Sequence, residues 1–240
     1  MSLDTATDVA ARVEELAHRV SILEAQQAVR RLQHQYGYYL DKCLYQEVVD
    51  LFADDGEVNF CGARFIGKAG VRRLYVGRFR QRFTADLNGP RFGFLLDHPQ
   101  HQDVITVAED GLSAKGRFRS LMQAGLHEDA KDTFPGHASM EQWWEGGIYE
   151  NEYVNDGGVW KFKVLNYRPV WHGEYSTGWA HQRPMQMNFE TYPDDPTGPD
   201  EIRGPGYEFF PNTEVFPFHY PHPVTGETVT SEDDEAARHA

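Results

Sequence analysis

Apolar residues change their spacing partway along this chain of 240 residues, from every third or fourth position to every second. Up to about residue 52 the longer period, which begins with Val13, Leu16, Val20 and Leu23, predicts helices. Alternation dominates later and predicts four long strands, at 101–109, 113–126, 142–155 and 159–172. Helices followed by a meander of strands indicate an α+β fold, because a parallel sheet would require helices and strands to alternate.

Shorter elements are expected between these segments: a helix at 45–52, a turn at 53–56, strands at 57–62 and 63–67, and a helix at 67–83. Asp110-Gly111 and Asp156-Gly157-Gly158 separate neighbouring long strands and predict hairpin turns. The sheet is therefore expected to be antiparallel.

The chain from residue 183 onward has a different composition. Nine of the 13 prolines lie between Pro184 and Pro223, interleaved with aromatic residues that a disordered linker would lack. This segment is expected to be an extended arm that packs its rings on the domain or on a neighbouring subunit, and to serve assembly and substrate enclosure. The domain organisation predicted is a helical extension at 1–24, a barrel at 25–182 and the arm at 183–240.

Charge and cysteine content exclude several classes of protein. The formal net charge of −14 opposes binding to nucleic acid or anionic lipid, and no apolar run is long enough to span a bilayer. The N-terminus lacks the pattern of a secretory signal. The two cysteines form neither a disulfide framework nor a CxxC pair, so we expect a reduced, cytoplasmic protein.

The first long helix carries the candidate chemical groups Tyr36, Tyr38, Tyr39 and Asp41. Tyr38 and Asp41 are three residues apart and share a helix face. Asp41 lies where the helix ends, a place that favours cations rather than carboxylates. A role as the cap of the next short helix is the alternative to a catalytic role.

The spacing of several segments resembles the SnoaL-like branch of the NTF2-like superfamily over about residues 25 to 180. The segments are Tyr36-x-Tyr38-x-x-Asp41, Leu51-Phe-Ala-Asp-Asp55, Gly67-Lys-Ala-Gly-Val71, Tyr149-Glu-Asn-Glu-Tyr-Val154, Gly158-Val-Trp-Lys-Phe162 and Gly178-Trp179. The resemblance implies a cone-shaped α+β barrel, in which a curved antiparallel sheet wraps against the N-terminal helices around one deep pocket. The fold hosts enzymes and binding proteins, so it does not name a reaction.

The dehydratases of this branch resembling scytalone dehydratase and bile-acid dehydratase use a Tyr and an Asp of the first helix with a pocket histidine. Tyr36 and Asp41 match the first two. His98 and His101 both precede the next strand, and His101 is preferred for its distance to the turn at 110–111. A histidine oriented by a buried carboxylate can move protons near neutral pH, and a tyrosine hydroxyl can assist a leaving oxygen. This chemistry needs no metal and no cofactor.

Further residues on the strands and their ends are candidates for binding a flat, bulky substrate. Together with Tyr38 and Tyr39 they are Arg119, Trp144, Tyr149, Asn166, His172 and Tyr175. Arg117 and Arg119 share one face of their strand, and an outward, solvated position is the alternative for both.

The function expected is therefore a lyase acting on a hydroxylated aromatic small molecule. The run from Val215 to Gly226 has a weaker resemblance to the diarylpropane γ-formaldehyde lyases of lignin-dimer catabolism, so dehydration and C–C cleavage with formaldehyde release both stay open. A non-catalytic binding or assembly subunit and a ketosteroid-type isomerase are the alternatives. Apolar surface on the N-terminal helix, the sheet and the arm predicts a homo-oligomer, with a trimer favoured over a dimer.

Overall fold

A curved sheet and one long helix form the protein, as the computed structural model shows for residues 3–133, 142–181, 188–204, 209–211, 213 and 215–230. The helices are α1 (Leu3–Asp41), α2 (Tyr45–Asp50), α3 (Gly67–Arg72), η1 (Arg73–Phe79), α4 (Arg80–Thr84), η2 (Glu128–Thr133) and η3 (Trp179–His181). The strands are β1 (Phe52–Phe60), β2 (Ala63–Ile66), β3 (Phe94–Asp97), β4 (Gln100–Val107), β5 (Ser113–Leu126), β6 (Gln142–Asp156), β7 (Val159–Glu174) and β8 (Glu201–Ile202).

The four long strands β4 to β7 lie close to the ranges expected from alternation. The sheet has the order β3-β5-β6-β7-β1-β2-β8. Strand β4 also pairs with β5, along a different part of that strand from β3. Gly111 and Gly157 have positive φ angles of 69° and 60° in the two hairpin turns, a conformation that glycine adopts without strain. The pair β1·β7 is parallel, which makes the sheet mixed rather than antiparallel throughout.

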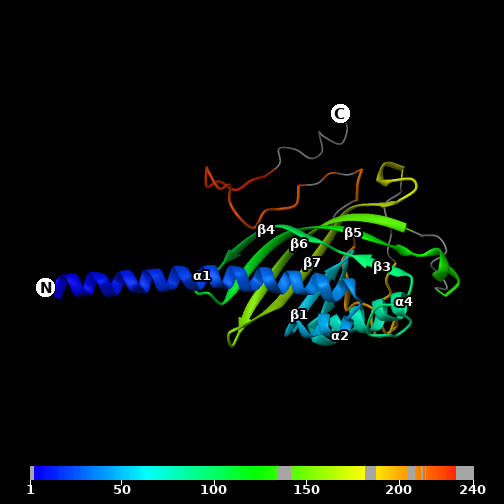
Figure 1. Cartoon of the computed structure of the whole chain (residues 1–240), viewed down its shortest axis with the longest axis horizontal. Coiled ribbons are helices and arrows are strands. Elements are labelled where there is room, and N and C mark those ends of the chain that lie inside the picture. The colour runs from blue at the N-terminus through cyan, green and yellow to red at the C-terminus, as the bar shows by residue number, and fades with distance from the viewer. Residues whose placement is uncertain are drawn as a thin grey trace.

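Helix α1 has two parts with different surroundings. From Ala25 onward its apolar residues are buried against the sheet, with Val29, Leu32, Tyr36 and Leu40 in the core. Its first part projects beyond the sheet into solvent (Figure 1). No helix among the described residues is long and apolar enough to cross a membrane.

The core lies between α1, α2 and the inner face of the sheet. Alternation along β5 and β6 directs Phe118, Tyr149 and Tyr153 inward, where they meet Phe162 of β7. Tyr36 lies at the centre of this cluster, with T-shaped contacts to Tyr75, Tyr149 and Phe162. The inner face of the sheet is thus lined by aromatic rings.

The structure differs from the local expectations at three places. Residues 53–56 do not form a turn after α2 but belong to β1, whose pairing with β7 shifts register between Phe52 and Glu57. The helix expected at 67–83 has a π-helical middle, η1, between α3 and α4. The short strands β3 and β8 had no alternating run long enough to predict them, because they depend on partners in β5 and β2.

The C-terminal arm packs on its own domain at two places, against the core and η1 near Phe189 and on the outer face of the sheet near Phe216. Strand β8 extends the sheet at β2, and Phe189 contacts Phe65 edge to face. Further along, Phe209 and Phe216 cover the outward residues Ile148 and Val170. Figure 1 shows this orange and red part of the chain running over the strands on the side away from α1. The parts of the arm that the structure describes therefore brace the sheet.

Candidate active site

The end of α1 directs its four candidate residues in different directions. Tyr36 is buried, whereas Tyr38, two residues on, is 74% exposed, because two residues of helix rotate the side chain by about 200°. Tyr39 is half-buried and packs against the core. Tyr38 therefore lies on the outer side of the helix, away from Tyr36.

Asp41 binds the chain at His98 and does not cap the next helix. Its Oδ1 accepts a hydrogen bond from the main-chain N–H of His98 at 2.7 Å, while α2 begins without a side-chain cap. Burial raises the pKa of the Asp41 carboxyl to about 6, with a further contribution from Asp97, although the hydrogen bond from His98 opposes the shift. Asp41 is thus a carboxyl group that titrates near neutral pH.

His98, and not His101, faces the interior. His98 is 7% exposed and its Nδ1 has no hydrogen-bond partner among the described residues. Burial lowers the pKa of its ring to about 3, so the imidazole is neutral. His101 is exposed and lies opposite Arg119 across β4 and β5. The preference for His101 was wrong because the β3–β4 connection, which sets the register, is not visible from strand spacing alone.

The contact expected between the carboxylate and the histidine ring is replaced by one to the histidine main chain. Asp41 holds the N–H of His98 and thereby fixes the backbone from which the ring projects. The ring of His98 keeps Nδ1 available on the interior side. The two residues are neighbours, as the resemblance implied, in a different hydrogen-bonding arrangement.

A buried polar network connects α1 to the sheet beside this pair. Tyr36 and Tyr75 share a hydrogen bond of 3.0 Å between their hydroxyls, and burial raises the pKa of Tyr36 to about 12. Gln33, which sequence reasoning missed, donates to Gln100 at 2.7 Å and accepts from Asn151 and Tyr153. These hydroxyls are therefore neutral hydrogen-bond donors at any physiological pH.

Close approach of β4 to α1 depends on Gly37. A Cβ at this position would lie 2.9 Å from Cγ of Gln100 and 3.5 Å from the carbonyl oxygen of His98. A side chain here would push the segment 98–100 away from the helix. Gly37 thus allows Asp41 and His98 to meet.

A second acidic group lies on the inner face at β6. Glu145 is 5% exposed, and its Oε1 accepts a hydrogen bond of 2.7 Å from the hydroxyl of Tyr167. Burial raises the pKa of Glu145 to about 7. Its cross-strand partner His172 is also buried, its Nε2 has no partner among the described residues, and burial lowers the pKa of its ring. Sequence reasoning found His172 but missed Glu145, although an acid within the aromatic run Trp143-Trp144-Glu145 was a usable signal.

Strand register places the two sets of groups in one row. Asp97 pairs with Gln123 and Gln100 with Ser120, so His98 lies opposite Met122. Met122 pairs with Glu145, and Glu145 pairs with His172. All four residues of this row are buried, and the Cα atoms of His98 and Glu145 are two strands, or roughly 10 Å, apart. We call His98, Met122, Glu145 and His172 the inner row.

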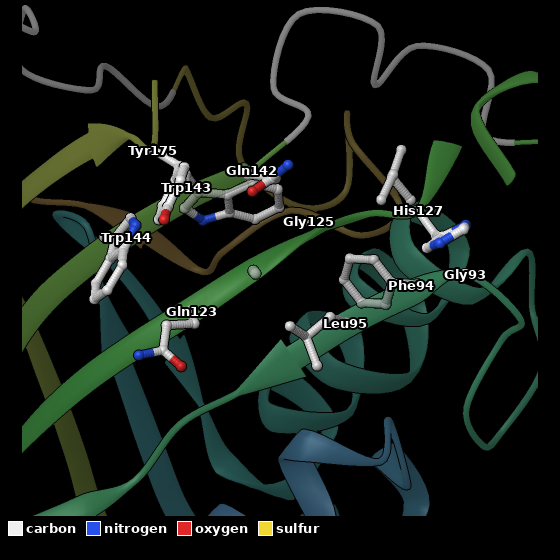
Figure 2. A pocket seen from close by; sticks show the side chains of 12 residues that line it. Gly93, Phe94, Leu95, Gln123, Gly125, His127, Gln142, Trp143, Trp144 and Tyr175 are labelled. Atoms are coloured by element: carbon white, nitrogen blue, oxygen red, sulfur yellow. The ribbon is translucent and has the colours of Figure 1, made fainter. Parts of the chain in front are cut away.

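An open pocket of about 590 Å³ adjoins the inner row. Ala124 and Trp143, which line it, are paired with each other and lie two residues beyond Met122 and Glu145 on the same strands. Figure 2 shows Trp144 and Tyr175 on one side of the pocket and Phe94 and Leu95 on the other. Trp144 and Tyr175 are stacked with ring centroids 5.7 Å apart. The pocket thus brings together Trp144 and Tyr175, although Trp144 alternates with Trp143 and Glu145 and so occupies an outward position of β6, on the other face from the inner row.

The remaining candidates lie elsewhere. Tyr149 is buried in the core beside Tyr36 and Tyr167. Arg119 is exposed on the outer face of the sheet, which is the outward, solvated position considered as the alternative to substrate binding. Asn166 alternates with the buried Leu165 and Tyr167, which directs its side chain to the outer side of β7. Neither Arg119 nor Asn166 faces the interior because both occupy outward positions of their strands.

Comparison with known proteins agrees with this architecture. A family model for the SnoaL-like domain matches residues 21–166. No curated protein matches the sequence. A scytalone-dehydratase-like protein from Novosphingobium aromaticivorans DSM 12444 is similar in structure, with a TM-score of 0.51, 20% identity, and coverage of 67% of this chain and 94% of that one.

Two structures of LinA-type proteins are similar as well. For LinA the TM-score is 0.53 at 16% identity, with 70% of this chain and 99% of that chain covered. For the hexachlorocyclohexane dehydrochlorinase LinA-type3 from Novosphingobium barchaimii LL02 the TM-score is 0.52 at 18% identity, with the same coverage of both chains. At such identities the likeness is one of fold, and relatives that share it include dehydratases and dehydrochlorinases, which are lyases. With its long helix packed on a curved, mostly antiparallel sheet and a domain model matching most of that unit, the chain belongs to the SnoaL-like family of the NTF2-like superfamily.

Proposed function

We propose that this protein is a cofactor-independent lyase that eliminates water, alone or with formaldehyde, from a bulky hydroxylated aromatic compound. The observation that carries the proposal is the inner row, which places a neutral imidazole and a second, weakly acidic carboxyl group on one buried face, two residues along β5 and β6 from the pocket residues Ala124 and Trp143. An elimination requires a base for the departing proton and an acid for the leaving oxygen. The row supplies one group of each kind.

His98 is the proposed base, with Asp41 as its partner. The ring is neutral in the resting protein because burial lowers its pKa to about 3, and the Asp41 carboxylate holds the main chain from which the ring projects. Because burial raises the pKa of Asp41 to about 6, this assistance is complete only above that pH. We therefore assign the role of base to the neutral ring of His98 and the role of positioning it to the ionised Asp41.

Glu145 is the proposed acid that gives a proton to the leaving oxygen. The sequence had suggested Tyr36 for this role. With a pKa of about 7, it retains its proton in much of the protein at neutral pH, whereas the pKa of Tyr36 is about 12. An acid whose pKa is close to the working pH transfers its proton most effectively. Tyr36 then serves as a neutral hydrogen-bond donor within the interior.

The aromatic lining of the pocket favours a flat substrate. Stacking between Trp144 and Tyr175 and the flanking Phe94 provide ring surfaces, and about 590 Å³ is the size of a pocket for a molecule of two or three rings. The groups needed for proton transfer are side chains of the chain itself, so the reaction balances without an external oxidant or reductant.

The two versions of the reaction differ in the bond that breaks. In dehydration, the base removes a proton from carbon and the adjacent hydroxyl leaves as water. In the cleavage version, the base removes the proton of a γ-hydroxyl, the Cβ–Cγ bond breaks to release formaldehyde, and its electron pair forms the double bond as the benzylic hydroxyl leaves as water. In both versions the acid gives the departing hydroxyl the proton that makes it water, and the base and the acid act at different atoms of the same substrate.

The test is to incubate the full chain with a panel of hydroxylated diaryl compounds, with and without a chelator, and to follow stilbene or alkene absorbance and formaldehyde. Catalytic turnover that survives chelation, and that Glu145→Gln lowers at least about 10²-fold, is the expected result. Saturable binding of the same compounds without turnover would instead identify a binding protein and overturn the proposal.

A further inference from the structure

The projecting part of α1 carries an apolar stripe that its own domain does not cover. Val9, Val13, Leu16, Val20 and Leu23 are between 46% and 60% exposed. Their spacing is four, three, four and three residues, which aligns them on one side of the helix. Figure 1 shows this part of the helix extending well beyond the sheet. An apolar stripe of this kind on a solvent-exposed helix marks a surface for association.

The residue types along the stripe specify the kind of association. In a heptad assignment the a positions are Val13 and Val20, and the d positions are Val9, Leu16 and Leu23. β-Branched residues at a with leucine at d favour parallel coiled coils of two strands, whereas other combinations favour three or four. The pattern departs from this rule only at Val9, at the N-terminal end.

Charges beside the stripe are complementary between two parallel copies. Arg19 occupies a g position and Glu24 the e position five residues later, the pair that meets across a parallel two-stranded coil. The neighbouring e position holds Ala17. Two parallel copies would therefore form two Arg19–Glu24 contacts, one on each side of the seam.

The stripe ends where α1 begins to pack on its own barrel. The next a and d positions are Gln27 and Arg30, both polar. Arg30 binds Asp103 of β4, with 2.6 Å between Nη2 and Oδ2, and from Ala25 onward a different side of the helix is buried. The apolar seam thus stops at the point where contacts within the chain take over.

We propose that residues 9–23 of α1 form a parallel two-stranded coiled coil with a second copy of this chain. The occupant of the stripe is the same stripe of the partner, and the two barrels extend from the same end of the coil. The coil is short, and each helix is held in place by the packing of its second half on its own barrel, which reduces the ordering that association must supply.

The first test is the molar mass of the full chain, measured by light scattering and by sedimentation over a range of concentrations. We expect a dimer, and we expect Leu16→Glu with Val20→Glu to raise the dissociation constant at least 100-fold. The matched control is His18→Glu with Ser21→Glu, which adds two glutamates on the other side of the same helix and should leave the mass unchanged. Circular dichroism and the Tm of the barrel confirm that the variants are folded.

The second test reports orientation through disulfide formation. With Cys61 replaced by serine, Val13→Cys and Val20→Cys should each give an oxidised dimer, because a parallel coil places each a position opposite itself. Glu14→Cys, which points away from the seam, is the control and should not. A charge exchange adds a check: Arg19→Glu should weaken the dimer, and Arg19→Glu with Glu24→Arg should restore it.

Each alternative outcome overturns the proposal. This coil would be excluded if the protein were a monomer at all concentrations or a trimer. It would also be excluded if the variant Leu16→Glu with Val20→Glu were still a dimer with an unchanged dissociation constant. Crosslinking at only one of Val13→Cys and Val20→Cys would exclude the parallel arrangement.

Discussion

The hydroxyl of Tyr167 donates a hydrogen bond to Oε1 of Glu145 at 2.7 Å, from one strand of the sheet to its neighbour. The tyrosine ring reaches Glu145 by crossing Gly147, which leaves space for it on the inner face. This contact stabilises the ionised form of Glu145 and partly offsets burial, which raises the pKa of the carboxyl. It therefore helps to keep the pKa of a buried acid near neutrality.

The rate should depend on pH as a narrow bell. Asp41 must be ionised, so kcat/KM rises with pH through about 6, and Glu145 must be protonated, so it falls above about 7. Asp97 and Lys42 lie near Asp41, and Tyr167 faces Glu145. Asp41→Asn should remove the acidic limb and Glu145→Gln the alkaline limb, as steady-state kinetics from pH 4.5 to 9 would reveal. A flat profile in the native protein would contradict these roles.

The free energy of unfolding should depend on pH through the titration of Glu145. Folding raises its pKa from 4.5 to about 7, so the stability it contributes is complete below pH 4.5 and is lost as pH rises through 7. Glu145→Gln removes this dependence, and its stability relative to the native protein should increase by about 3 kcal/mol between pH 4 and pH 8. Urea unfolding at several pH values measures it. An unchanged difference across this range would show that Glu145 is not desolvated in the native protein.

Replacing His98 and replacing His101 should have very different effects on kcat. His98→Ala should lower kcat by at least about 10² while leaving the fold intact, because the proposed base is lost. His101→Ala should be close to the native protein, since that side chain is exposed on the outer face. Parallel kinetics of the two variants on the same substrate provide the comparison, and equal effects would reject the assignment of His98.

Adding a methyl group at Gly147 should destabilise the protein by displacing Tyr167. A Cβ there would lie 2.5 Å from Cζ of the tyrosine ring. Gly147→Ala should cost about 2 kcal/mol, in the range for overpacking a core. A double-mutant cycle with Tyr167→Ala provides the control: the penalty should shrink by at least about 1 kcal/mol when the ring is absent. Additive effects would show that the two residues do not compete for the same space.

The C-terminal arm should contribute to stability and not to catalysis. Phe216 covers Ile148 and Val170 on the outer face, and Arg117 donates from Nη2 to the carbonyl oxygen of Phe216 at 3.2 Å. Phe216→Ala should lower the free energy of unfolding by about 2–4 kcal/mol. Its kcat and KM should remain within about twofold of native values at a temperature where the variant is folded. A selective rise in KM would instead indicate that the arm contacts the substrate.

The order and type of the main elements could be predicted because they depend on local spacing. The run from Ser113 to Leu126 alternates in burial as far as Ala124 and was expected to be a strand with these ends. The inward position of Tyr36 could be anticipated from the family resemblance. The short strands β3 and β8 could not, because they owe their pairing to residues far away in the sequence.

The candidate site was predictable in its components and not in its assembly. Tyr36, Asp41 and His172 carry their chemistry in their side chains, so their residue types and positions in the chain were enough to select them. Which histidine meets Asp41 depends on the register of the β3–β4 connection, and one residue of shift moves a side chain to the other face of the sheet. Glu145 was missed because an acidic residue becomes a weak acid only when the surrounding core removes it from water.

The sequence by itself determined the α+β class, the long helix with its apolar stripe and the family to which the chain is similar, because these follow from residue type and spacing. The tertiary structure alone decided that His98 faces inward, that Glu145 shares its row, and that Phe209 and Phe216 of the arm cover the outer face of the sheet. Register, burial and desolvation are properties of neighbours brought together by folding. They depend on contacts between segments that are distant in the sequence, so the spacing of residues along the chain does not reveal them.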